Sequence, residues 1–126
     1  MIEIPVKPKR ILVVDDDHDF LESMQLLLLD YGHEVIPASN GKEAVEKYAE
    51  YGPDIVLLDF KMPGIDGYET LLHIVKLDSD ARVVLTSAYA LDDAQYRRTV
   101  DMSLSGLLPK PIEFANLAKT IARHAK

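Results

Sequence analysis

The chain has 126 residues, which suits one domain with a substantial core, and we expect a single domain over 1–126 with an irregular lead-in at 1–8. The formal net charge of −7 argues against nucleic acid or an anionic membrane as a direct partner. The absence of cysteine excludes disulfides, thiolate metal sites and cysteine nucleophiles. No apolar run approaches the length that spans a bilayer, and the N-terminus lacks a signal-peptide pattern, so we expect a cytoplasmic protein.

Short apolar runs alternate with amphipathic segments from about residue 10 onward. The run Ile11-Leu12-Val13-Val14 predicts a strand at 10–14, and helical spacing of apolar residues predicts a helix over 17–31 that ends near Gly32. A second strand is expected at 34–38. After the turn at Asn40-Gly41, a helix over 42–51 ends at Gly52-Pro53.

The run Ile55-Val56-Leu57-Leu58 predicts a third strand at 54–58, buried on both faces because branched apolar residues fill it. The same alternation then predicts further helices and strands to the end of the chain. In order, they are a helix at 68–77, a strand at 82–86, a helix at 92–102, a strand at 106–108 and a helix at 113–124. Five β-α units in series predict an α/β fold, a doubly wound parallel sheet with five helices.

Two prolines help to choose the strand order. Pro37 and Pro109 lie in or beside the second and fifth strands. Proline has no amide hydrogen to donate to a ladder and is confined mostly to edge strands. The flavodoxin-like order 2-1-3-4-5 makes these two strands the edges. The first and third strands are then neighbours at the switch point of the sheet, where ligands bind in open α/β folds.

Carboxylates follow both of these neighbouring strands. Asp15 and Asp16 come after the first strand, and Asp59 ends the third. Three negative charges in one small volume repel each other unless a cation compensates them. Mg²⁺ is a hard cation that prefers oxygen ligands, so the cluster predicts a magnesium site. Asp17, one residue further, is better explained as the cap of the following helix.

A hydroxyl and an ammonium follow the last two strands. Thr86 and Ser87 offer hydroxyls at the end of the fourth strand, and Lys110 follows the fifth. Carboxylates with a metal, a lysine and a hydroxyl form a sensible site for phosphoryl transfer, because the cations and the hydroxyl bind the oxygens of the transferring group. Asp59 is the candidate nucleophile, since a carboxylate needs no general base.

Taken together, these motifs resemble the response-regulator receiver domain of two-component signalling. The resemblance covers nearly the whole chain, and four short motifs in the right order carry it. The matching residues are Ile11-Leu12-Val13-Val14-Asp15-Asp16, Leu58-Asp59 through Met62-Pro63-Gly64 to Asp66-Gly67, Ser87-Ala88, and Lys110-Pro111. The resemblance implies a phosphorylation-controlled signalling domain rather than an enzyme, with a histidine kinase or a histidine phosphotransfer protein as partner.

The resemblance also implies a role for each residue of the site. Asp59 would accept the phosphoryl group, and Asp16, Asp59 and the backbone carbonyl of Lys61 would ligate Mg²⁺, with Asp15 helping through water. Lys110 would contact the phosphoryl oxygens, and its peptide bond to the next proline would be cis. Ser87 would be the switch hydroxyl.

Some residues depart from the family pattern or from this interpretation. Leu107 stands where the family usually has an aromatic residue, and Leu104 stands where it commonly has a small one.

An aspartyl-nucleophile phosphatase is the alternative function, although its usual continuation after Asp15-x-Asp17 is missing. The four histidines share no metal-ligand spacing and are expected at the surface.

Two outputs remain open. In one, phosphorylation remodels the face formed by the helix at 92–102, the strand at 106–108 and the helix at 113–124, which then binds a target protein. In the other, the chain passes its phosphate on. Lys61 and Tyr89 would flank the path of attacking water and shield the acyl phosphate. The loops that carry them resemble those of the sporulation phosphorelay intermediate, which favours a shuttle.

Overall fold

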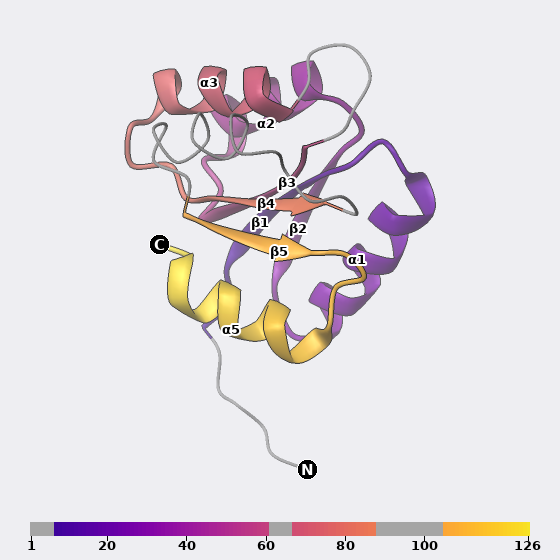
Figure 1. The fold of residues 1–126 in the computed structure, drawn as a ribbon. Coiled ribbons are helices and arrows are strands. Elements are labelled where there is room, and N and C mark those ends of the chain that lie inside the picture. Colours follow the sequence, from indigo (N-terminus) through magenta and orange to yellow (C-terminus); the bar gives the residue numbers. More distant parts are fainter. Residues whose placement is uncertain (1–6, 61–66, 88–104) are drawn as a thin grey trace.

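A computed structural model describes residues 7–60, 67–87 and 105–126 of the chain (Figure 1). Five parallel strands form one sheet in the order β2-β1-β3-β4-β5, which confirms the expected flavodoxin-like topology. Each strand lies within one or two residues of its expected position. The strands are β1 (Arg10–Val14), β2 (Glu34–Ala38), β3 (Ile55–Asp59), β4 (Val83–Ser87) and β5 (Gly106–Pro109).

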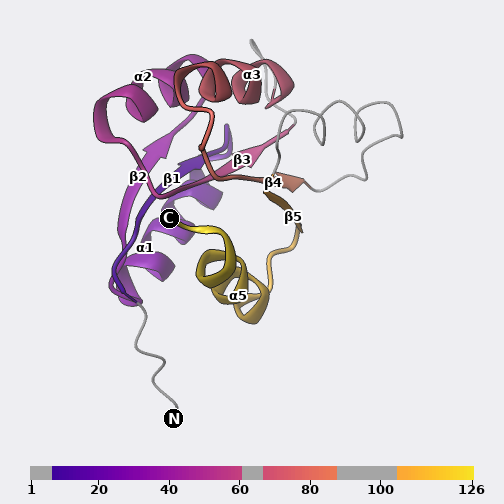
Figure 2. The same cartoon turned by 90° about the vertical axis from the view of Figure 1, so that its left-hand side faces the viewer.

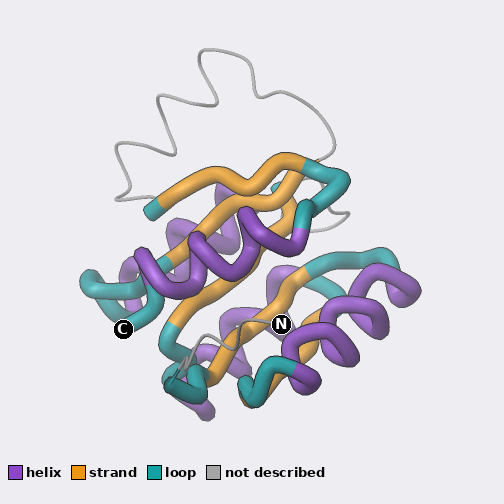
Figure 3. Tube along the Cα trace, turned by 90° about the horizontal axis from the view of Figure 1, so that it is seen from below, coloured by secondary structure: helices purple, strands orange, loops and turns teal. Residues whose placement is uncertain are grey.

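Helices cover both faces of the sheet. Within the described ranges they are α1 (His18–Asp30), α2 (Gly41–Tyr51), α3 (Gly67–Leu77) and α5 (Phe114–His124). Figure 2 shows α2 and α3 on one face of the sheet and α1 and α5 on the other. Seen from below, α1 and α5 lie in front of the strands (Figure 3). The helix expected at 92–102 lies outside the described residues.

The two layers of helices bury two separate apolar clusters. Alternate residues of β1 point to opposite faces, so Leu12 joins the cluster under α2 and α3, while Ile11 joins the one under α1 and α5. Both residues are fully buried. Each Å² of buried apolar surface stabilises the fold by about 25 cal/mol, so these fully buried central strands contribute strongly to its stability. The sheet therefore provides a rigid base for the side chains at its ends.

The prolines lie where the sequence placed them, on the two edge strands. Pro37 is in β2 and pairs in register with Val13 of β1. Pro109 is the last residue of β5 and pairs with Ser87 of β4. Because each edge strand has a neighbour on one side only, a residue without an amide hydrogen costs least there.

Capping residues set the helix boundaries. Asp17 is the N-cap of α1, and its side chain accepts hydrogen bonds from the backbone amides of Asp19 and Phe20, which confirms its expected role. Asn40 caps α2 by accepting from the amide of Glu43 at 2.8 Å. Gly52 ends α2 with a φ of +54°, a left-handed conformation that glycine adopts without strain.

One expectation about the histidines is wrong. His33, between α1 and β2, is buried, with 6% of its surface exposed. Its Nδ1 accepts a hydrogen bond from the backbone amide of Lys9 at 3.0 Å. His18 and His73 are exposed, as expected, and His124 is half-buried.

Among the described helices, none combines the length and the apolar character that a membrane span needs.

Candidate functional site

Three carboxylates converge at the carboxyl ends of β1 and β3. These strands are neighbours, and Val14 pairs in register with Leu58, so the residues that follow them lie side by side. One oxygen from each of Asp15, Asp16 and Asp59 lies within 4.8 Å of the others. Asp15 and Asp59 are buried, while Asp16 is exposed. The sheet topology thus brings together the three carboxylates that the sequence singled out.

Asp15 is almost completely enclosed, with 1% of its surface exposed. One carboxylate oxygen accepts a hydrogen bond from the amide of Asp17 at 2.9 Å, and the other accepts from the Lys110 ammonium at 2.5 Å. Its own amide donates to the carbonyl of Ala38 at 3.0 Å. A buried charge is tolerated only with such partners. The direct pairing with Lys110 is a contact that sequence reasoning did not foresee.

Lys110 reaches the cluster from the loop after β5. Its Nζ lies 4.0 Å from Oδ1 of Asp59, and its side chain is 19% exposed. The peptide bond to Pro111 is cis, as the family resemblance implied. The ammonium also lies 4.2 Å from the centre of the Phe20 ring, a cation–π distance. Phe20 was not among the predicted site residues, because nothing in the sequence links it to a lysine 90 positions away.

Asp59 ends β3 and is 6% exposed. It pairs in register with Thr86 of β4, and the amide of Phe60 donates to the carbonyl of Thr86 at 3.2 Å. Ser87 is the next residue and ends β4 beside Pro109, so the ends of β3 and β5 flank β4 at the same end of the sheet. Lys61 and Tyr89, the two residues expected to control water access, lie outside the described residues.

The donor set of this cluster suits a hard divalent cation. Carboxylate oxygens are the ligands that Mg²⁺ prefers, and the described residues offer three of them against a single ammonium. One lysine cannot neutralise three clustered carboxylates. The chemistry of the residues present therefore fits the expected magnesium ion.

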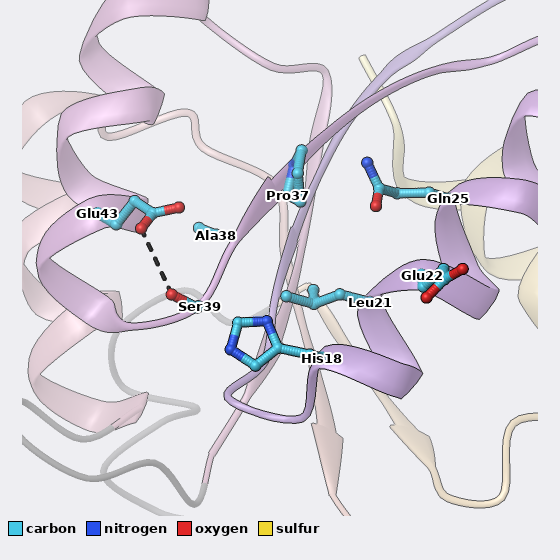
Figure 4. Close-up of a pocket in the computed structure, with 8 residues that line it drawn as sticks. All are labelled: His18, Leu21, Glu22, Gln25, Pro37, Ala38, Ser39 and Glu43. Carbon is cyan, nitrogen blue, oxygen red and sulfur yellow. Dashed lines mark hydrogen bonds between the residues drawn. The ribbon is translucent and has the colours of Figure 1, made fainter.

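A separate pocket of about 420 Å³ opens between α1 and the end of β2 (Figure 4). His18 at the start of α1 faces Ser39 and Glu43 across it, and Ser39 donates a 3.4 Å hydrogen bond to Glu43. None of the three clustered carboxylates lines this pocket. Within the described residues, the three clustered carboxylates therefore lie at the end of the sheet and not in this pocket.

Comparison with known proteins identifies the family. The family model described as "Response regulator receiver domain" matches residues 11–122. The chemotaxis protein CheY of Thermotoga maritima is 31% identical over 119 residues, covering 94% of this chain and 98% of the relative. The chemotaxis protein CheY of Listeria monocytogenes is 35% identical over 121 residues, covering 93% of this chain and 98% of the relative.

Solved structures agree in fold. A CheY-like receiver domain protein from Methanospirillum hungatei is 27% identical with a TM-score of 0.87, covering 93% of both chains. The response regulator TrrA from Thermotoga maritima, solved in complex with Mg²⁺–BeF, is 33% identical with a TM-score of 0.82, covering 91% of this chain and 97% of TrrA. The chain belongs to the response regulator receiver domain family, and it is a phosphate-accepting signalling domain rather than an enzyme.

Proposed function

We propose that Asp59 is the residue that accepts the phosphoryl group. The observation that carries this assignment is its position: it ends a central strand, lies in the carboxylate cluster and has the Lys110 ammonium 4.0 Å from one oxygen. A carboxylate oxygen of Asp59 would attack phosphorus, the bond from phosphorus to a histidine nitrogen of the donor would break, and an acyl phosphate would form. The freed histidine takes up a proton.

Asp15, Asp16 and Asp59, with the backbone carbonyl of Lys61, would hold Mg²⁺. When bound, the ion would supply positive charge against the phosphoryl oxygens. The solved Mg²⁺–BeF complex of the related TrrA supports a metal at this kind of site. Asp15 would contribute through water, since its oxygens already accept from Asp17 and Lys110.

Lys110 and Ser87 complete the proposed site. The Lys110 ammonium, now paired with Asp15, would turn toward the oxygens of a phosphoryl group on Asp59. The Ser87 hydroxyl would be the switch that follows the phosphate, because Ser87 ends the strand next to β3. Both groups stabilise the negative charge of the transferred group rather than make or break bonds.

Intact mass measured after incubation with Mg²⁺ and a small acyl-phosphate donor tests the assignment. Wild type should gain the mass of one phosphoryl group, and Asp59→Asn should gain none. Asp80→Asn, which removes an exposed carboxylate outside the cluster, is the matched control and should behave as wild type. If Asp59→Asn still becomes phosphorylated on Asp15 or Asp16, the assignment is wrong.

The phosphoryl donor would be a histidine kinase or a histidine phosphotransfer protein, the partners with which receiver domains interact. We also propose that residues 1–126 form one domain that works in the cytoplasm. The family model spans most of this range, and the CheY relatives of similar length support a single domain.

For output, we propose a phosphate shuttle like the sporulation phosphorelay intermediate. Lys61 and Tyr89 carry this proposal, since a long and an aromatic side chain beside Asp59 would hinder the in-line approach of water. The test measures the rate of phosphate loss from wild type, Lys61→Ala and Tyr89→Ala at fixed Mg²⁺. Both variants should lose phosphate faster than wild type. Equal lifetimes in all three proteins would remove the argument for a shuttle.

A second output is binding of a target protein on the β5–α5 face. One observation favours it: Leu107 is 47% exposed on β5 and borders a pocket of about 260 Å³ that Lys119 and Arg123 also line. Leu107→Ala should then weaken target binding but leave phosphoryl transfer to a histidine phosphotransfer protein unchanged. A shuttle that needs no target would show no effect of this substitution.

A further inference from the structure

The Lys110 ammonium has neighbours from three separate elements. Its Nζ lies 2.5 Å from Oδ2 of Asp15 after β1, 4.0 Å from Oδ1 of Asp59 at the end of β3, and 4.2 Å from the centre of the Phe20 ring in α1. An ammonium has three donors and no acceptor, so away from water it is stabilised by hydrogen-bond acceptors, negative charges or the face of an aromatic ring. The phenyl ring is the one uncharged partner among these three.

Phe20 is held in place independently of the lysine. It lies in the first turn of α1, where its amide donates to the capping carboxylate of Asp17 at 3.2 Å. Its ring is half-buried and packs against the apolar cluster under α1 and α5. Lys110, by contrast, carries its charge on a flexible four-carbon stem. The rigid partner in this contact is therefore the aromatic ring, and the mobile partner is the lysine.

We propose that Phe20 is a positioning residue for phosphoryl transfer: its ring face holds the Lys110 ammonium at the point from which it serves Asp59. This inference rests on the proposed roles of Asp59 and Lys110. The negative face of the ring attracts the cation without competing for its donated hydrogens as a carboxylate does. The ammonium can thus exchange Asp15 for a phosphoryl oxygen on Asp59 while its contact with the ring persists.

The position of the ring decides what Lys110 can reach. Asp15 holds the ammonium at 2.5 Å, while the nearer oxygen of Asp59 lies 4.0 Å from it. Without the ring, the stem could leave the site for solvent, and each productive return would cost conformational entropy. A ring at 4.2 Å limits this freedom, because leaving it gives up the cation–π attraction and exposes apolar surface.

The first test needs neither metal nor phosphate. Phenylalanines with an increasing number of ring fluorines replace Phe20, which weakens the negative face of the ring while keeping its shape. The rate at which an amine-acylating reagent modifies Lys110 in the metal-free protein is measured by peptide mass, with the exposed Lys119 as internal reference. The Lys110 rate should rise with each fluorine while the Lys119 rate stays constant. A constant Lys110 rate would overturn the proposal.

The second test measures phosphorylation by a small acyl-phosphate donor at saturating Mg²⁺. The rate constant should fall progressively along the fluorinated series, by roughly two- to thirtyfold in total. It should also fall in Phe20→Leu, whereas Phe20→Tyr should retain most of the wild-type rate. In a Lys110→Ala background, Phe20→Leu should have no further effect, because the ring acts through the lysine. Thermal unfolding of each variant checks that the fold is unchanged.

The two tests separate this inference from the function on which it rests. One outcome would overturn the role of Phe20 alone. In it, wild type is phosphorylated on Asp59 and Lys110→Ala slows this reaction, but the rate stays constant along the fluorinated series. Wild type that gains no phosphoryl group would overturn the proposed function and the inference with it. An equal loss of rate from Phe20→Leu with and without Lys110 would assign Phe20 a packing role only.

Discussion

His33 is a base held in its neutral form by its surroundings. Burial, followed by the nearby positive charge of Lys9, lowers its pKa below the ordinary value of 6.5. Its Nδ1 accepts the amide hydrogen of Lys9, and a protonated ring would have no lone pair there. The same ring borders the small apolar pocket between Tyr31 and Phe114, whose rings stack at 4.3 Å. One residue thus joins Lys9, just before β1, to the α1–α5 side of the domain.

Acid should therefore weaken the fold through His33. Because its pKa is lower in the folded chain, the unfolded chain binds more protons between that lower pKa and 6.5. The stabilisation is complete above 6.5 and is lost as the pH falls through the folded pKa. Urea unfolding at pH values between about 7 and 5 should show a steeper loss of stability in wild type than in His33→Asn, which keeps an acceptor near the Nδ1 position. Parallel pH profiles would contradict this account.

Polar contacts of Asp78 join two helices and the C-terminus. Asp78, just after α3, accepts a hydrogen bond from the Lys126 ammonium at 2.7 Å and one from the Tyr48 hydroxyl of α2 at 2.7 Å. Both bonds lower the pKa of Asp78, to about 2, and the bond from Lys126 has the largest effect. Burial and the same carboxylate raise the pKa of Tyr48. The Asp78 side chain thus connects α2, the end of α3 and the C-terminus. This contact lies near the amino ends of the strands, whereas the acidic site lies at their carboxyl ends.

The start of α3 depends on a close approach of two backbones. Gly67 is the first residue of α3, and a Cβ there would lie 2.5 Å from Cα and 2.9 Å from the carbonyl oxygen of Phe60. Gly67→Ala should destabilise the fold by about 1–3 kcal/mol in chemical unfolding, although alanine favours helices, because backbone atoms cannot move aside as a side chain can. Phe60 follows Asp59, so phosphorylation should slow as well.

Gly106→Ala is the matched control for this substitution. A Cβ at Gly106 would meet only the His124 ring, at 3.2 Å from Nε2, and a side chain near the C-terminus can turn away. This variant should lose less stability than Gly67→Ala. Equal losses in the two variants would show that the contact with Phe60 does not decide the cost.

At the scale of the whole molecule, the sheet was predictable because its signals are local. Runs of branched residues marked the strands, and Pro37 and Pro109 at the two edges helped to choose the flavodoxin-like order that the sheet has. The order in turn placed Asp15, Asp16 and Asp59 together. Topology therefore brings two local motifs, Asp15-Asp16 after β1 and Asp59 at the end of β3, into one site.

What could not be predicted depends on contacts between distant parts of the chain. The burial of His33 depends on how Lys9 and α5 pack around it. The contact of Phe20 with Lys110 depends on the angle at which α1 leaves the sheet, which no periodicity encodes. The direct pairing of Asp15 with Lys110 depends on the reach of one flexible side chain.

The carboxylate cluster should make the stability of the whole domain depend on Mg²⁺. Without metal, the exposed Asp16 repels its two buried neighbours, and Lys110 compensates only part of the charge. Asp16→Ala should therefore raise the free energy of unfolding of the metal-free protein by about 1 kcal/mol. Wild type should gain about 2.7 kcal/mol at a Mg²⁺ concentration of about 100 times its Kd, and the variant should gain little.

Thermal unfolding with and without Mg²⁺ measures both effects, and Asp80→Asn, outside the cluster, should respond to Mg²⁺ as wild type does. The two expected changes have opposite signs, which separates them from a general loss of packing: a damaged fold would be less stable in both conditions. If metal-free Asp16→Ala is no more stable than wild type yet loses its response to Mg²⁺, Asp16 is a ligand whose charge is screened by water. If the variant keeps the full response, Asp16 is not a ligand, and Asp15 and Asp59 hold the ion without it.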